Sequence, residues 1–152
     1  MKDTAEINAE ISKTLNHLTE ICIDGEKGFQ EAGEGLMDVE LAATCLQYST
    51  QRRQFARELQ DEVRQLGGEP VYSGTLAGAL HRGWLNIKNA VLSKDDEAII
   101  AECERGEDAA KEAYEEALND YLPPAITGVI QRQYQGVVDA HDRFSALKKS
   151  VR

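Results

Sequence analysis

Apolar residues recur along most of this chain at intervals of three and four positions, which is the spacing of one face of an α-helix. The pattern predicts four long amphipathic helices and one shorter helix. Their expected ranges are residues 4–33, 38–66, 75–92, 94–119 and 124–149. We find no segment in which apolar and polar residues alternate as in a half-buried strand, so we expect an all-α protein.

Glycine and proline mark the boundaries between these helices. The pair "GG" at 67–68 ends the second long helix, and "PP" at 123–124 opens the last one. Short connections make consecutive helices antiparallel neighbours, whereas the stretch from 67 to 93 must carry the chain back along the bundle. We therefore expect one domain over residues 1–152, a ferritin-like four-helix bundle of two hairpins joined by a helical crossover.

A short motif occurs twice in the chain. "CIDGEK" begins at Cys22, and "CERGED" begins 81 positions later at Cys103. Aligning residues 22–32 with residues 103–113 matches five of eleven positions. The two helices that open the hairpins therefore resemble copies of one another, related by a pseudo-twofold axis.

The glycine within each motif indicates that a large side chain of another helix packs against it. Gly25 and Gly106 lie inside helices, where glycine costs about 1 kcal/mol relative to alanine. A helix tolerates this cost where a large side chain of another helix packs against it. We expect Tyr48 and Tyr134 to fill the space.

Each motif also carries a glutamate directly after its glycine, Glu26 in the first copy and Glu107 in the second. Arg52 lies on the core-facing stripe of the second helix, about one turn from the level of Glu26. Because unpaired buried charges are too costly to persist, we expect an interior polar layer in which the guanidinium neutralises both carboxylates. Its further expected members are Gln51, Tyr48 and Tyr134. The competing interpretation turns Arg52 outward and leaves both glutamates at the rim.

Two carboxylates on facing helices could also begin a di-iron or di-manganese site. Such a site needs a Glu-x-x-His pair on each partner helix. The second helix has no histidine, and on the last helix the residue three before His141 is Val138. We therefore expect no cofactor, with a divergent iron or manganese protein for redox or iron handling as the alternative. The ligands of that alternative would be Glu26, Glu104, Glu107 and His141, with Gln51 beside them.

The composition argues against several partners and compartments. The 152 residues carry a net charge of −10, which disfavours nucleic acid and anionic membranes. Between Asp95 and Asp120, eleven acidic residues stand against Arg105 and Lys111, a net charge of −9. No apolar run reaches the roughly 18 residues of a membrane span and we find no signal peptide, so we expect a cytoplasmic protein. Reduced, buried thiols are expected at three apolar helical positions: Cys22, Cys45 and Cys103.

The crossover is the expected contact with other copies of the chain. Its sequence, "TLAGALHRGWLNIKNAVL", contains glycines that permit close approach and Trp84, which the pattern leaves exposed. One interpretation packs this segment on the bundle as a fifth helix, and the other gives its second face to another copy. We expect both, and therefore a homo-oligomer that forms through the region of Trp84.

Three stretches resemble a known family: "LNHLTEICIDGEKGF", "GGEP…GTLAGALHRGW" and "DDEAIIAECERGEDAAKEAYEEAL". They are similar to an uncharacterised family of mainly proteobacterial four-helix-bundle proteins that are classed by fold as ferritin-like. The resemblance implies this fold and a bacterial cytosolic setting, and it brings no established activity. We find no Ser-His-Asp, GxSxG or P-loop pattern, so the expected function is that of a non-enzymatic structural or binding protein.

Overall fold

The computed structural model describes residues 2–74, 84 and 86–150, and these form helices and connecting segments without a strand. The expected all-α class is therefore confirmed for this part of the chain. Residues 1, 75–83, 85 and 151–152 lie outside the description. The described helices are α1 (Thr4–Gly35), α2 (Val39–Gln65), α4 (Ile87–Leu92), α5 (Asp96–Leu118) and α6 (Pro124–Ser150).

The helices begin and end where the sequence supplies caps. Asp3, Asp38 and Asp95 precede α1, α2 and α5, and each side chain accepts a hydrogen bond from a backbone N–H of the first turn. With Asp95 as its N-cap, α5 begins at Asp96, two residues later than expected. At the other end of α2, Gly67 adopts a φ of +80°, a conformation that favours glycine and ends the helix.

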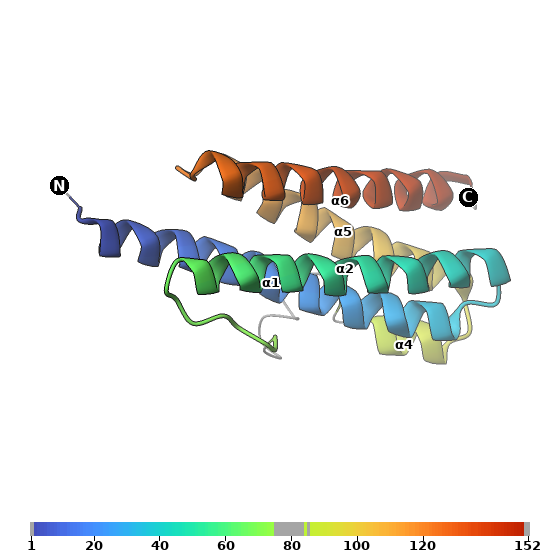
Figure 1. The fold of residues 1–152 in the computed structure, drawn as a ribbon. Coiled ribbons are helices and arrows are strands. Elements are labelled where there is room, and N and C mark those ends of the chain that lie inside the picture. Colours follow the sequence, from blue (N-terminus) through green and yellow to red (C-terminus); the bar gives the residue numbers. More distant parts are fainter. Residues whose placement is uncertain (1, 75–83, 85, 151–152) are drawn as a thin grey trace.

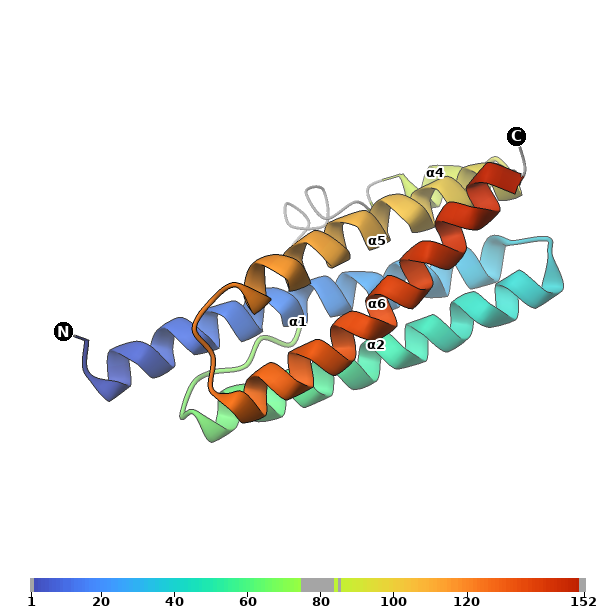
Figure 2. The ribbon, with the colours of Figure 1, turned by 90° about the horizontal axis from the view of Figure 1, so that it is seen from above.

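Two antiparallel hairpins make up the bundle (Figure 1). The first consists of α1 and α2, and the second consists of α5 and α6. The hairpins pack with α1 beside α5 and with α2 beside α6, while α4 packs against α1 and α5. In the view from above, α2 and α5 lie along opposite edges of the bundle (Figure 2).

The core consists of two apolar clusters that follow one another along the bundle. The first contains Leu15 and Leu59, and the second contains Ile99 and Phe144, all fully buried. Arg52 lies at the level where the two clusters meet. Among the described helices, none combines the length and the apolarity needed to cross a membrane.

The crossover departs from the expected helix over 75–92. Residues 75–83 and 85 of that range lie outside the description, and of the rest only Ile87–Leu92 is helical. Its first part is held by side chains of the first hairpin. Asn16 donates to the carbonyl of Glu69 at 3.0 Å and accepts from the N–H of Val71 at 3.1 Å, and Gln60 donates to the carbonyl of Val71 at 2.9 Å.

Trp84 is buried, so the expectation that it is exposed was wrong. Its side chain is 7% exposed, and its indole lies between α1 and α5. A Cβ added to Gly28 or to Gly106 would overlap the ring, and Phe29 meets the ring edge-on at 5.0 Å between centroids. The two glycines therefore form a slot that the crossover's own aromatic side chain fills.

Candidate functional site

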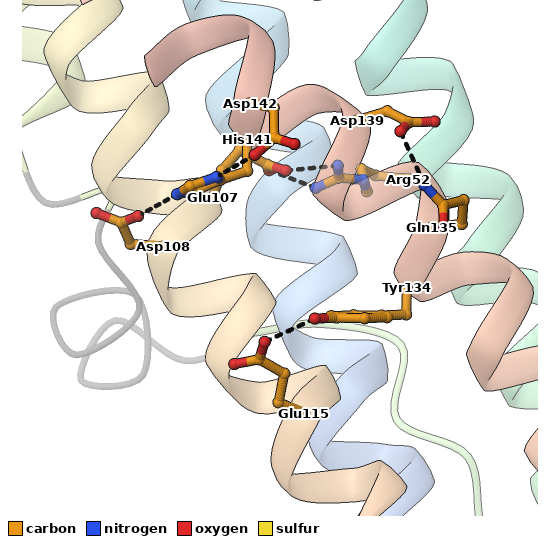
Figure 3. Close-up of polar contacts among 9 residues, drawn as sticks. All are labelled: Arg52, Glu107, Asp108, Glu115, Tyr134, Gln135, Asp139, His141 and Asp142. Carbon is orange, nitrogen blue, oxygen red and sulfur yellow. Dashed lines mark hydrogen bonds and ion pairs between the residues drawn. The ribbon is translucent and has the colours of Figure 1, made fainter. Parts of the chain in front are cut away.

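The centre of the bundle contains a buried ion pair. Arg52 of α2 donates to both carboxylate oxygens of Glu107 of α5, from Nη1 to Oε1 at 2.5 Å and from Nη2 to Oε2 at 2.7 Å (Figure 3). The two side chains are 1% and 0% exposed. Burial lowers the pKa of Arg52, but the attraction of Glu107 outweighs it and leaves the pKa raised, so the guanidinium stays charged. This two-pronged geometry is the strongest form of an arginine–carboxylate contact.

Small and aromatic groups of α1 make room for the arginine. A Cβ on Gly25 would lie 3.4 Å from Cγ of Arg52, so this glycine borders the arginine side chain. The guanidinium carbon lies 5.3 Å from the ring centroid of Phe29, within the range of a cation–π contact. Gln51 accepts a hydrogen bond from Nε of Arg52 at 3.3 Å, which engages the remaining guanidinium edge.

Glu26 does not join this buried pair, so the expected layer of two carboxylates around one arginine was wrong on this point. Its carboxylate accepts a hydrogen bond from Nε of Arg53 at 2.7 Å, and its side chain is 25% exposed. The two terminal nitrogens of the Arg52 guanidinium, Nη1 and Nη2, both donate to Glu107. The second copy of the motif therefore supplies the buried anion, while the first copy supplies a rim residue.

The two tyrosines expected in the layer have other neighbours. Tyr48 packs on the rings of Phe29 and Phe144, at centroid distances of 5.3 and 5.9 Å. Tyr134 donates to Glu115 at 2.6 Å near the surface (Figure 3). The space beside the motif glycines is filled instead by Arg52 at Gly25 and by Trp84 at Gly106. Sequence periodicity could not identify these neighbours, because both come from other elements of the fold.

A second buried network lies next to the ion pair. Tyr114 donates to Oε1 of Gln133 at 2.7 Å, and its oxygen lies 3.1 Å from Sγ of Cys22, which can then donate to it. Gln133 in turn donates to the carbonyl of Phe55 at 3.2 Å and to Glu58 at 3.0 Å. Burial raises the pKa of Cys22 to about 11 and also raises the pKa of Tyr114. Both groups therefore remain protonated and act as hydrogen-bond donors rather than as nucleophiles.

Sequence reasoning missed Tyr114 and Gln133 as members of this network, although the repeat contained a signal for Gln133. Gln133 follows Arg52 by 81 residues, the same offset that separates the two cysteine motifs. The offset links buried positions in all four long helices. The pairs include Leu18 and Ile99, Cys22 and Cys103, Gly25 and Gly106, Arg52 and Gln133, Leu59 and Ala140, and Val63 and Phe144. The repeat thus covers both helices of each hairpin, and one half carries glutamine where the other carries arginine.

The four residues proposed as alternative metal ligands are held apart by separate partners. The partners are Arg53 for Glu26, Lys148 for Glu104, Arg52 for Glu107, and Asp108 with Asp142 for His141. Among the described residues, no three His, Cys, Asp or Glu side chains form a group that could hold a metal ion. The cluster of Glu26, Glu104, Glu107 and His141 that the alternative requires is therefore not formed, because each of the four side chains is held by a different partner.

His141 links the two helices of the second hairpin. Its Nε2 lies 2.6 Å from Asp108 of α5, and its Nδ1 lies 3.1 Å from Asp142 of α6 (Figure 3). Partial burial lowers the pKa of His141, and Lys111 lowers it further. The hydrogen bonds to Asp142 and Asp108 outweigh both effects and leave the pKa raised. The protonated imidazole therefore bridges two aspartates.

This bridge makes stability depend on pH. Because the folded pKa of His141 is above the value of about 6.5 in an unfolded chain, the stabilisation is fully present below about pH 6.5. It is lost as the pH rises through the folded pKa. We expect the free energy of urea unfolding to fall with rising pH by less in His141→Asn than in the wild type. His17→Asn, at an exposed histidine of α1, is the matched control, and identical profiles for wild type and His141→Asn would contradict the assignment.

Comparison with known proteins gives a family but no activity. Residues 10–120 match the model of a family that is described as a domain of unknown function (DUF2383). No curated protein matches the chain.

Proposed function

Because the chain belongs to the DUF2383 family, whose description assigns no function, we propose one from the geometry of the molecule. We propose a non-enzymatic structural or binding protein in which an interior polar layer joins the two hairpins without a metal. The observation that supports this is the Arg52–Glu107 pair. The guanidinium supplies the positive charge that a buried carboxylate requires, and both carboxylate oxygens accept from it.

The chemistry of the neighbouring groups also supports a structural layer. A catalytic group must reach its substrate, and the side chains of Arg52 and Glu107 are removed from solvent. The adjacent thiol of Cys22 and phenol of Tyr114 are fully buried and protonated. These groups hold α1, α2, α5 and α6 in register, and the exposed faces of those helices are then available for partners.

The proposal also includes the fold class, the cellular location and the oligomeric state of the protein. We assign the bundle to the ferritin-like arrangement, which is supported by one long crossover between two antiparallel hairpins. We propose a bacterial protein in the cytoplasm, and the cytoplasmic location is supported by three cysteines that are free and buried, as expected in a reducing compartment. We further propose that the protein works as a homo-oligomer, and that other copies contact its helical faces rather than Trp84.

Metal titration tests the proposal against the iron or manganese alternative. Fe²⁺ (without oxygen) and Mn²⁺ are titrated into the purified chain by calorimetry, and metal content is measured after growth in iron-rich medium. We expect no tight site, and the same weak heats in Glu26→Ala as in the wild type. Stoichiometric, tight binding that disappears in Glu26→Ala would overturn the proposed function.

A further inference from the structure

Acidic side chains form one stripe along the outer face of α5. Asp108, Glu112, Glu115 and Glu116 are exposed, and exposed Asp120 follows just after the helix. Spacings of three and four residues place these side chains on one side of the helix, over a length of about 18 Å. Arg105, the exposed basic residue of α5, is already paired with Glu102. Because Asp108 already meets the imidazole of His141, the negative charge of the stripe is carried mainly by Glu112, Glu115, Glu116 and Asp120.

Arginines form a stripe of similar length on α2. Arg53, Arg57 and Arg64 are exposed and follow one another at intervals of four and seven residues, over about 16 Å. Arg53 meets Glu26, and Arg64 meets Asp61, in exposed pairs of the kind that contributes about 0–1 kcal/mol. Arg57 makes no ion pair with any residue that the structure describes. Such weak or absent pairing leaves the guanidinium groups available to a stronger acidic partner.

The two stripes lie on opposite sides of the molecule. Arg53 reaches Glu26 of α1, its own hairpin partner, whereas Glu115 and Asp108 reach Tyr134 and His141 of α6 (Figure 3). Each stripe thus faces away from the other hairpin, and α2 and α5 run along opposite edges of the bundle (Figure 2). Within one molecule the stripes cannot meet.

The stripes are also at the same level along the bundle. Asp96, the first residue of α5, accepts hydrogen bonds from the N–H groups of Met37 and Asp38 just before α2. The two helices therefore start at the same end and run in the same direction. The contacts of Asp96 with Met37 and Asp38 give offsets of 59 and 58 residues at the start of the two helices, and the Arg52–Glu107 contact gives an offset of 55 halfway along. Both stripes begin beside that second contact, where residues 55 apart lie at about the same level.

Applied to the stripes, this offset pairs opposite charges. Arg53 is level with Asp108, Arg57 is level with Glu112, and Arg64 is level with the residue just before Asp120. A second copy that is displaced sideways, without a shift along the bundle axis, brings its α2 against the acidic α5 of the first. Arg53 and Arg57 of one copy then face Asp108 and Glu112 of the other, and Arg64 faces Asn119, directly before Asp120.

We propose that a second copy of this chain docks its α2 arginine stripe on the acidic α5 stripe, and that the contact repeats into chains of molecules. The inference rests on the proposed function, because it names the surfaces through which the bundle assembles. The two surfaces differ and lie on opposite sides, so the contact is heterologous and is not closed by a twofold axis. Salt bridges at this contact oppose the repulsion between molecules of net charge −10. That repulsion is screened beyond about 8 Å at physiological ionic strength.

A charge-exchange experiment tests the contact. Analytical ultracentrifugation measures the weight-average mass of the full chain, whose monomer is 16.8 kDa. In about 0.05 M salt we expect at least about twice the monomer mass at high protein concentration, and a return to monomer in about 0.5 M salt. Arg57→Glu alone and Glu112→Lys alone should each be monomeric. Their equimolar mixture should regain the larger mass, because the new carboxylate on α2 of one variant then meets the new ammonium group on α5 of the other.

Matched controls separate the contact from a general effect of net charge. Lys27→Glu and Glu6→Lys change the same charges at exposed positions of α1 and should associate as the wild type does. A wild type that is monomeric in low salt, a mixture no larger than its components, or a loss of association in the controls would each overturn the inference. A monomeric wild type would also count against the proposed homo-oligomer, whereas the metal-free polar layer is tested separately by the metal titration.

Discussion

Replacing Glu107 with alanine should lower the free energy of unfolding by about 3–5 kcal/mol, the usual cost of breaking a buried ion pair from one side. The side chain of Arg52 is 1% exposed in the intact protein, so the variant would leave a buried guanidinium without its carboxylate and with Gln51 as its remaining acceptor. A small domain has only about 5–15 kcal/mol of stability, so the loss is large. Urea unfolding followed by circular dichroism measures it directly.

Two further variants identify the cause of that loss. The double variant Arg52→Met with Glu107→Leu removes both charges and keeps similar volumes, so it should be as stable as the wild type or more stable. Glu26→Ala, at the equivalent position of the first motif, should cost no more than about 1 kcal/mol, because its pair with Arg53 is near the surface. Equal effects of Glu107→Ala and Glu26→Ala would contradict the assignment of the buried pair to Glu107 alone.

Replacing Trp84 with alanine should cost about 3–5 kcal/mol, because the indole fills the slot between Gly28 and Gly106 and its removal leaves a cavity there. Trp84 is the only tryptophan in the chain, so its fluorescence reports the slot without interference. Native emission should lie at short wavelength, as expected for a side chain that is 7% exposed. Urea unfolding of Trp84→Ala, followed by circular dichroism, gives the size of the effect.

The glycines of the slot provide the matched test. Gly106→Ala should destabilise by about 1–3 kcal/mol and shift the emission to longer wavelength, because its Cβ overlaps the ring and forces it out. In the background of Trp84→Ala the same substitution meets an emptied slot, so its cost should largely disappear. Additive costs in the double variant would show that Trp84 does not occupy the slot. Gly128→Ala, at an exposed position of α6 where an added Cβ meets nothing within 4 Å, is the control.

The helices were predictable because each signal for them is local. Periodic apolar residues and the boundary residues Asp38, Gly67 and Pro124 act through neighbours within one or two turns. The segment before α4 was the exception. Trp84 and Asn86 read as part of an amphipathic helix, but neither residue is helical, and Trp84 turns its ring into a slot formed by two other helices. At Trp84, packing of a large aromatic side chain outweighed a weak local preference that two glycines, Gly78 and Gly83, had already lowered.

The candidate site was predictable only in part, for the same reason. A buried arginine and a glutamate of the repeat could be expected to meet, because charge cannot be buried unpaired. Arg52 pairs with Glu107 rather than Glu26 because of which helix faces the arginine, and this arrangement cannot be derived from a single sequence. Gln133 could have been found from the 81-residue offset, whereas Tyr114 has no such signal beyond its place on the apolar stripe.

By itself, the sequence determined that this protein is a helical bundle, where its long helices lie, and that an internal repeat relates its hairpins. These properties follow from periodicity and local propensity, which operate along the chain. Only the tertiary structure decided that Arg52 binds Glu107 through both terminal nitrogens and that Trp84 lies between two glycines. It also decided that the arginine and carboxylate stripes occupy opposite edges of the bundle at the same level. Those outcomes depend on the rotation and register of helices distant in sequence, and such quantities are set when all the helices pack together.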